Sequence, residues 1–200
     1  MSLKKIFSGS TSTMSQSKGW IVLVFFLFAL SLCVQAQNAK PDVKKHEQKV
    51  RDMVAFLEYV LNTLGSASTS ARDKDVLITE SYTKIFRDAK VQIEDDLVEK
   101  RNVITNKDVQ AYLKDVDFFY DNLKFEFTIK DIQGKVNASD RLFYKVSLIR
   151  NMQGTTVEGK LVNNTIPRYI EVNYDPKDQD LKIVSIYTNE FDEKEGLLNW

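Results

Sequence analysis

The chain has 200 residues with 28 basic and 28 acidic side chains, so its formal net charge is zero. Three lysines and no acids lie in residues 1–36, which leaves residues 37–200 with a net charge of −3. An evenly mixed, mildly acidic surface argues against nucleic acid as a partner and against an anionic lipid surface, because both need a basic face.

The first 36 residues have the pattern of a secretory signal peptide. Lys4, Lys5 and Lys18 precede an almost wholly apolar run over 20–32, and Val34-Gln35-Ala36 supplies small residues for cleavage after Ala36. The apolar run is about 13 residues long, short of the ~20 that a membrane-spanning helix needs. We therefore expect a secreted or periplasmic protein of the cell envelope, with no stable membrane span after cleavage. An uncleaved anchor and lipidation at Cys33 are the alternatives.

The region after the signal is predicted to begin with helices. Residues 37–43 form a short lead-in, with Asp42 able to cap a helix, and 44–190 form the domain. The first helix ends at Gly65 and has an apolar stripe at intervals of three and four residues, made by Val50, Met53, Val54, Leu57, Val60, Leu61 and Leu64. Ser70 with Asp73, or Asp73 alone, can cap a second helix, and Thr105 with Asp108 can cap a third.

The remainder of the domain is predicted to be a sheet. A short strand over 91–94 precedes the acidic corner Asp95-Asp96. Apolar and polar residues then alternate over 124–130, 142–149, 169–174 and 181–187, the period of strands with one buried face. Turns are expected at Gln133-Gly134, at 137–140 and at 151–154. Pro167 lies inside a strand-like run, which places that point at a sheet edge or a bulge.

This order of elements resembles the nuclear transport factor 2-like superfamily, a cystatin-like α+β cone. The resemblance covers 44–188 and includes Phe86-Arg87-Asp88-Ala89 before the short strand and the late strand 183–187. It implies an α+β fold in which a curved antiparallel sheet wraps around two to three N-terminal helices. Such folds include isomerases, dehydratases, cyclases and non-catalytic binding domains, so a site must decide the function.

The ketosteroid isomerase branch of that superfamily suggests one candidate site. The resemblance implies Tyr59 as the group that polarises a carbonyl and Asp95 or Asp96 as the base. The later strand has Arg168 and Glu171 where that branch has a buried acid, and this difference argues against the same chemistry. The sheet aromatics suggest instead a ligand cavity, whose candidate lining is Tyr59, Phe125, Phe127, Tyr144, Arg168 and Tyr187.

The function that we predict is an exported, non-catalytic binding or accessory domain of the bacterial envelope. Its partner would be a protein or a small apolar ligand, and a homodimer through the outer sheet face is possible. The alternative is a small isomerase, dehydratase or cyclase acting on an apolar carbonyl compound. With His46 as the single histidine, the sequence predicts neither a metal nor a cofactor. Residues 191–200 are predicted to be a C-terminal tail or a short helix.

Overall fold

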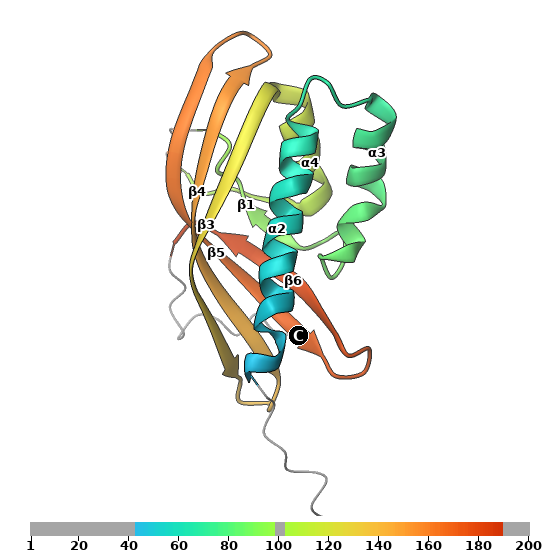
Figure 1. Cartoon of the computed structure of the whole chain (residues 1–200), viewed down its shortest axis with the longest axis vertical. Coiled ribbons are helices and arrows are strands. Elements are labelled where there is room, and N and C mark those ends of the chain that lie inside the picture. Colours follow the sequence, from blue (N-terminus) through green and yellow to red (C-terminus); the bar gives the residue numbers. More distant parts are fainter. Residues whose placement is uncertain (1–42, 99–102, 190–200) are drawn as a thin grey trace, which may run out of the picture. The chain divides into compact units, whose positions relative to one another are not determined.

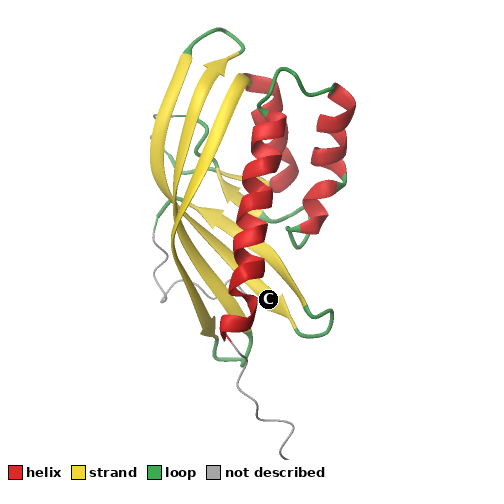
Figure 2. Cartoon of the chain, in the orientation of Figure 1, coloured by secondary structure: helices red, strands yellow, loops and turns green. Residues whose placement is uncertain are grey.

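The structure is a computed structural model that describes residues 43–98 and 103–189. The predicted signal peptide, Cys33, Asp42 and the tail 191–200 lie outside the described residues. In the described part, a curved six-stranded sheet is covered on one face by three α-helices (Figures 1 and 2). The sequence therefore predicts the α+β class correctly. None of the helices in this part is long and apolar enough to cross a membrane.

The helices follow the predicted apolar stripes, with differences at their ends. They are α2 (Glu47–Leu64), α3 (Ala71–Thr79) and α4 (Val109–Phe119), with short 3-10 turns at Val43–His46 and Ser81–Lys84. Ser70 caps α3 as predicted, because its Oγ accepts the Asp73 N–H at 3.2 Å. The predicted cap of α4 is wrong. Asp108 makes no cap hydrogen bond, since its Oδ1 accepts from Gln92 Nε2 at 2.5 Å.

The six strands form one sheet in the order β2-β1-β6-β5-β4-β3. Their bounds are β1 Gln92–Glu94, β2 Asn106–Asp108, β3 Tyr120–Val136, β4 Leu142–Thr156, β5 Leu161–Asp175 and β6 Asp180–Tyr187. Two predicted turns are wrong, because Gly134 pairs with Tyr144 and Gly154 pairs with Val162 inside long hairpins. Continuous pairing with a neighbouring strand has overridden the local preference of these glycines for a turn.

Pro167 occupies the edge position that the sequence predicts. It lies within β5 and pairs with Ile149 of β4, but β6 pairs with β5 only from Tyr169 onward. At Pro167, β5 therefore has a neighbouring strand on one side only. A proline is tolerated at such a position, because the N–H that it lacks is not needed for pairing with a second neighbour.

Helix α2 covers the free edge of β3. The Asn62 side chain donates to the Phe125 carbonyl at 3.0 Å and accepts the Phe125 N–H at 2.6 Å. The Glu58 carboxylate accepts the Phe127 N–H at 2.7 Å. These two side chains take the place of a further strand, so this stretch of edge has satisfied backbone groups and is closed to pairing with another chain.

Two glycines permit close backbone contact at the start of β3. A Cβ on Gly65 would lie 2.6 Å from the Leu123 carbonyl oxygen, and a Cβ on Gly154 would lie 2.7 Å from that of Asn122. Asn122 has φ 51° at a register shift between β3 and β4. The Leu123 N–H donates to the Gly65 carbonyl at 2.9 Å. The end of α2, the bulge of β3 and the end of β4 can thus pack backbone against backbone, because Gly65 and Gly154 have no side chain.

We predict that Gly65→Ala destabilises the domain, although alanine is the better helix former. Gly65 has ordinary helical dihedrals, φ −73° and ψ −6°, so only the clash with Leu123 opposes the substitution. The expected loss is about 1–3 kcal/mol in the free energy of unfolding, measured by urea denaturation. Ser68→Ala, at an exposed position in the same loop, serves as the control and should change stability by less than ~0.5 kcal/mol. Equal stability of the two variants would contradict the close contact.

Candidate functional site

Two arginines lie on the inner face of the sheet, among apolar neighbours. In β4 the inward residues are the even-numbered ones from Leu142 to Met152, and Arg150 takes one of these positions. In β5 Arg168 precedes the inward residues Ile170 and Val172. Arg150 is 1 % exposed and Arg168 is 5 % exposed. Buried guanidinium groups need a nearby negative charge, since leaving such an ion in an apolar interior is very costly.

The negative charge comes from Asp96, in the segment that follows β1. Its Oδ2 lies 2.9 Å from Arg150 Nη2 and is also in contact with Arg168 Nη1. Its Oδ1 accepts a hydrogen bond from the Tyr112 hydroxyl at 2.9 Å, and Tyr112 comes from α4. Arg150 further donates to the side chain of Asn164 at 3.0 Å. We call Asp96, Tyr112, Arg150 and Arg168 the inner charge cluster.

The cluster fixes the protonation of its members. Burial would raise the pKa of Asp96, but the charges of Arg168 and Arg150 outweigh it, so this pKa lies below its usual range. Burial and the Asp96 carboxylate raise the pKa of Tyr112 well above its usual range. Asp96 is therefore an ionised, ion-paired carboxylate, and a group of this kind is a poor general base.

The other two acids near Asp96 also have partners. Asp95 accepts the Leu97 N–H at 3.2 Å and lies 2.5 Å from Lys107 Nζ. Glu94 accepts the Thr188 N–H at 2.6 Å and a second bond from the Thr188 hydroxyl. The loop after β1 is thus joined to β2 through Asp95, and the end of β1 is joined through Glu94 to the residue that follows β6. No group of three or more His, Cys, Asp or Glu suited to a metal ion is found among the described residues.

The candidate isomerase residues are not brought together. Tyr59 is 58 % exposed on α2 and lines neither a small space inside the domain nor a larger hollow on its outer face. Asp95 and Asp96, in contrast, are buried and ion-paired. Of the predicted cavity residues, Phe127 and Arg168 do line an inner space, but its volume is about 10 Å³, room for about one water molecule. Phe125 and Tyr144 are core residues. Tyr187 stacks on Tyr169, with ring centroids 5.8 Å apart, on the opposite face of the sheet.

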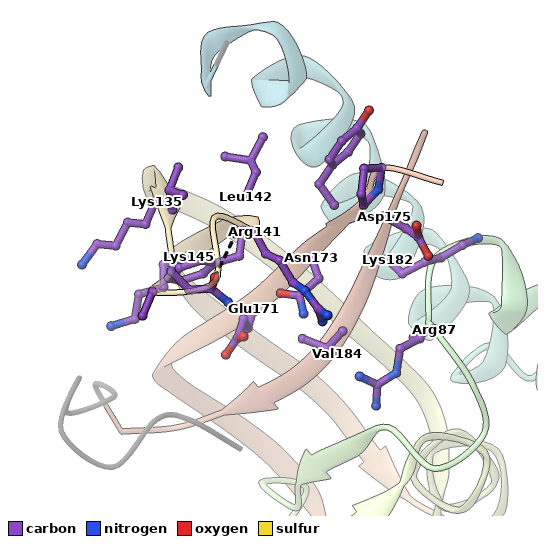
Figure 3. A pocket seen from close by; sticks show the side chains of 16 residues that line it. Arg87, Lys135, Arg141, Leu142, Lys145, Glu171, Asn173, Asp175, Lys182 and Val184 are labelled. Atoms are coloured by element: carbon purple, nitrogen blue, oxygen red, sulfur yellow. Dashed lines mark hydrogen bonds between the residues drawn. The ribbon is translucent and has the colours of Figure 1, made fainter. Parts of the chain in front are cut away.

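A much larger cavity lies on the outer face of the sheet, and sequence reasoning missed it. We call it the outer hollow; its volume is about 680 Å³, within the range of ligand pockets (Figure 3). Its walls come from the β3–β4 turn, from β4, β5 and β6, and from the segment before β1. The lining residues are Arg87, Lys135, Val136, Asn137, Ala138, Arg141, Leu142, Phe143, Lys145, Glu171, Asn173, Tyr174, Asp175, Pro176, Lys182 and Val184.

Cations outnumber acids around the outer hollow. Its lining includes three lysines and two arginines against Glu171 and Asp175. Arg87 pairs with Asp88 at 2.9 Å, and Lys182 lies 3.2 Å from Asp180. The Arg141 guanidinium extends over the hollow toward Asn173 and has no hydrogen-bond or ion-pair partner within 43–98 and 103–189 (Figure 3). Such an arrangement favours an anion at the rim.

The floor of the outer hollow offers acceptors and apolar surface. Asn173 Oδ1 is buried and has no hydrogen-bond partner in the part of the chain that the structure describes. Burial raises the pKa of the Glu171 carboxyl, against the opposing charges of Lys145 and Arg87. Phe143 and Val184 add apolar side chains beside these acceptors. A ligand that fits therefore carries carboxylates, N–H donors and apolar groups together.

Comparison with known proteins supports the fold. No protein-family model and no curated protein matches the sequence. A nuclear transport factor 2-like superfamily protein from Salmonella enterica serovar Typhimurium superimposes with a TM-score of 0.50 at 10 % identity, covering 79 % of this chain and 99 % of that one. This likeness shows the nuclear transport factor 2-like fold that the element order predicts.

Other solved structures match this chain with lower scores. An uncharacterised protein with a cystatin-like fold from Caulobacter vibrioides has a TM-score of 0.46 at 10 % identity and covers 75 % of this chain and 92 % of that one. Naphthalene 1,2-dioxygenase has a TM-score of 0.45 at 12 % identity and covers 78 % of this chain and 83 % of that one. A fold alone does not select a function.

We predict that Asp96→Asn is strongly destabilising. The substitution leaves Arg150 and Arg168 buried without their counter-charge, and removing one partner of a buried pair costs about 3–5 kcal/mol. Urea denaturation measures the loss, and Asp121→Asn, an exposed carboxylate on β3, is the matched control. A loss below ~1 kcal/mol would mean that the cluster contributes little to folding.

The same carboxylate predicts a pH dependence. The pKa of Asp96 is lower in the folded state than in the unfolded chain, so its stabilisation is complete above the unfolded value of about 4 and is lost as pH falls through the folded value. The stability gap between the parent and Asp96→Asn should therefore be constant between about pH 5 and 7 and narrow in stronger acid. Denaturation curves at several pH values measure this gap. A gap that stays constant down to about pH 2 would contradict the predicted shift.

Proposed function

We propose that this protein is an exported, non-catalytic binding domain whose outer hollow takes an acidic, partly apolar peptide segment of a partner protein. The observation that carries the proposal is the cation-rich hollow of about 680 Å³ on the outer sheet face. Lys135, Arg141 and Lys145 are placed to attract carboxylates. The buried Asn173 Oδ1 calls for an N–H donor, which a peptide backbone provides and a simple anion lacks.

The interior of the domain supports a binding role over a catalytic one. Its space of about 10 Å³ cannot hold a carbonyl substrate. Asp96 is held ionised between two arginines, and Tyr59 lies on the solvent side of α2. The nuclear transport factor 2-like fold is compatible with either role. Export rests on the signal-like pattern of residues 1–36, and the envelope of a bacterium is the compartment that we propose.

The binding site can be tested with anilinonaphthalene sulfonate, a fluorescent probe that joins an anion to apolar rings. We expect it to bind the folded protein in the outer hollow. The double substitution Arg141→Glu with Lys145→Glu should weaken binding by about tenfold, because two rim charges then repel the sulfonate. Lys114→Glu with Lys160→Glu makes the same charge change at two exposed positions outside the hollow and should leave the affinity unchanged.

Two results would count against this proposal. One is equal affinity of the two double variants for the probe, which would place the probe elsewhere. The other is that the probe binds neither the parent chain nor any variant, including a variant that ends at Asn189 and so lacks residues 190–200. Circular dichroism with thermal unfolding verifies that both double variants are folded.

A further inference from the structure

The C-terminal residues of this chain have the composition that the outer hollow selects. Residues 190–200 contain Glu190, Asp192, Glu193 and Glu195 against the single cation Lys194, a net charge of −3. The hollow, with its five cations and two acids, has a net charge of +3. The segment also carries the apolar residues Phe191, Leu197, Leu198 and Trp200. It therefore offers carboxylates, backbone N–H donors and apolar side chains within eleven residues.

The strand that leads to the end of the described chain also lines the hollow. Lys182 and Val184 of β6 line the hollow, and β6 ends at Tyr187, three residues or about 10 Å beyond Val184. Eleven residues can span up to about 36 Å when extended, so a chain that turns back reaches the hollow with length to spare.

Glu94 holds Thr188, close to the end of the described chain. Its carboxylate accepts both the backbone N–H and the hydroxyl of Thr188. Immediately before Thr188, the Tyr187 ring lies on the outer face in a stack with Tyr169, between the exit and the hollow. The chain thus leaves the sheet beside an aromatic surface that continues toward Glu171 and Lys145.

We infer that residues 190–200 bind in the outer hollow of the same molecule. This inference rests on the proposed function, because it names this chain's own segment as one occupant of the peptide site. Carboxylates of the segment face Arg141 and Lys145, and its apolar side chains contact Phe143 and Val184. A partner peptide then binds only by displacing the segment, so the affinity of the hollow for partners is set by competition within the chain.

Trp200 reports this contact directly. The chain has two tryptophans, Trp20 and Trp200, so the full chain with Trp20→Phe retains Trp200 alone. We expect blue-shifted emission and weak quenching by acrylamide, compared with a synthetic peptide of residues 189–200. The substitutions Arg141→Glu and Lys145→Glu, made together, should raise the quenching constant several-fold, toward that of the peptide. The control Lys114→Glu with Lys160→Glu should leave it unchanged.

A second measurement does not depend on the variants. Sodium chloride at about 1 M shortens the Debye length to about 3 Å and should increase quenching of Trp200 in the parent chain. Shielding of Trp200 that is the same at low and high salt and in both double variants would place the segment elsewhere and overturn the inference. Shielding that disappears on dilution would assign the contact to a second copy of the chain, which also overturns it.

The inference and the proposed function fail in different ways. If Trp200 is as exposed in the parent as in the peptide, the inference is wrong, while charge-dependent binding of anilinonaphthalene sulfonate still supports a binding site in the hollow. If both hold, deletion of residues 190–200 should strengthen probe binding several-fold, because the competing segment is gone. Unchanged probe affinity on deletion would contradict the inference alone.

Discussion

The contact of Asp96 with Arg150 and Arg168 is the interaction on which the interior of this domain depends. Without it, two guanidinium groups on neighbouring strands would be buried with no counter-charge, which costs several kcal/mol of desolvation free energy for each group. The single carboxylate of Asp96 neutralises part of their charge. Asp96 can do so only if the segment after β1 crosses the inner face of the sheet. Tyr112 then brings α4 to the same point through its hydroxyl group. One carboxylate thereby sets the relative position of two strands, one loop and one helix.

The interior of this domain is nearly filled, and its larger cavity lies on the outer face of the sheet. The side chains that line the inner space leave about 10 Å³, whereas the outer face has a hollow of about 680 Å³. The hollow lies at the end of the sheet where β4 and β6 begin and β5 ends, and the turn between β3 and β4 carries Arg141 over it (Figure 3). The long hairpin is itself anchored by the close contacts at Gly65 and Gly154.

Local patterns in the sequence predict the elements well and the sites poorly. Alternation finds every long strand, and Ser70 and Pro167 have the roles that their chemistry indicates. Gly134 and Gly154 mislead, because a turn preference is weak beside the pairing of a long hairpin. The buried position of Arg150 could have been predicted from the sequence, because it falls on an inward position of an alternating strand. A charge at such a position requires a partner of opposite charge. The outer hollow left no such signal, since its walls come from segments far apart in the chain.

The balanced composition also explains why no ionic partner could be inferred from the sequence. A net charge of zero excludes a chain that is basic throughout, but it places no limit on where charges of each sign lie. Folding brings five cations from three strands, a turn and one further segment to one hollow, although they are spread over nearly a hundred residues. Four of the acids that balance them are concentrated in the last eleven residues. An excess of positive charge in the hollow attracts negative charge, so this charge pattern favours the acidic occupant that we propose.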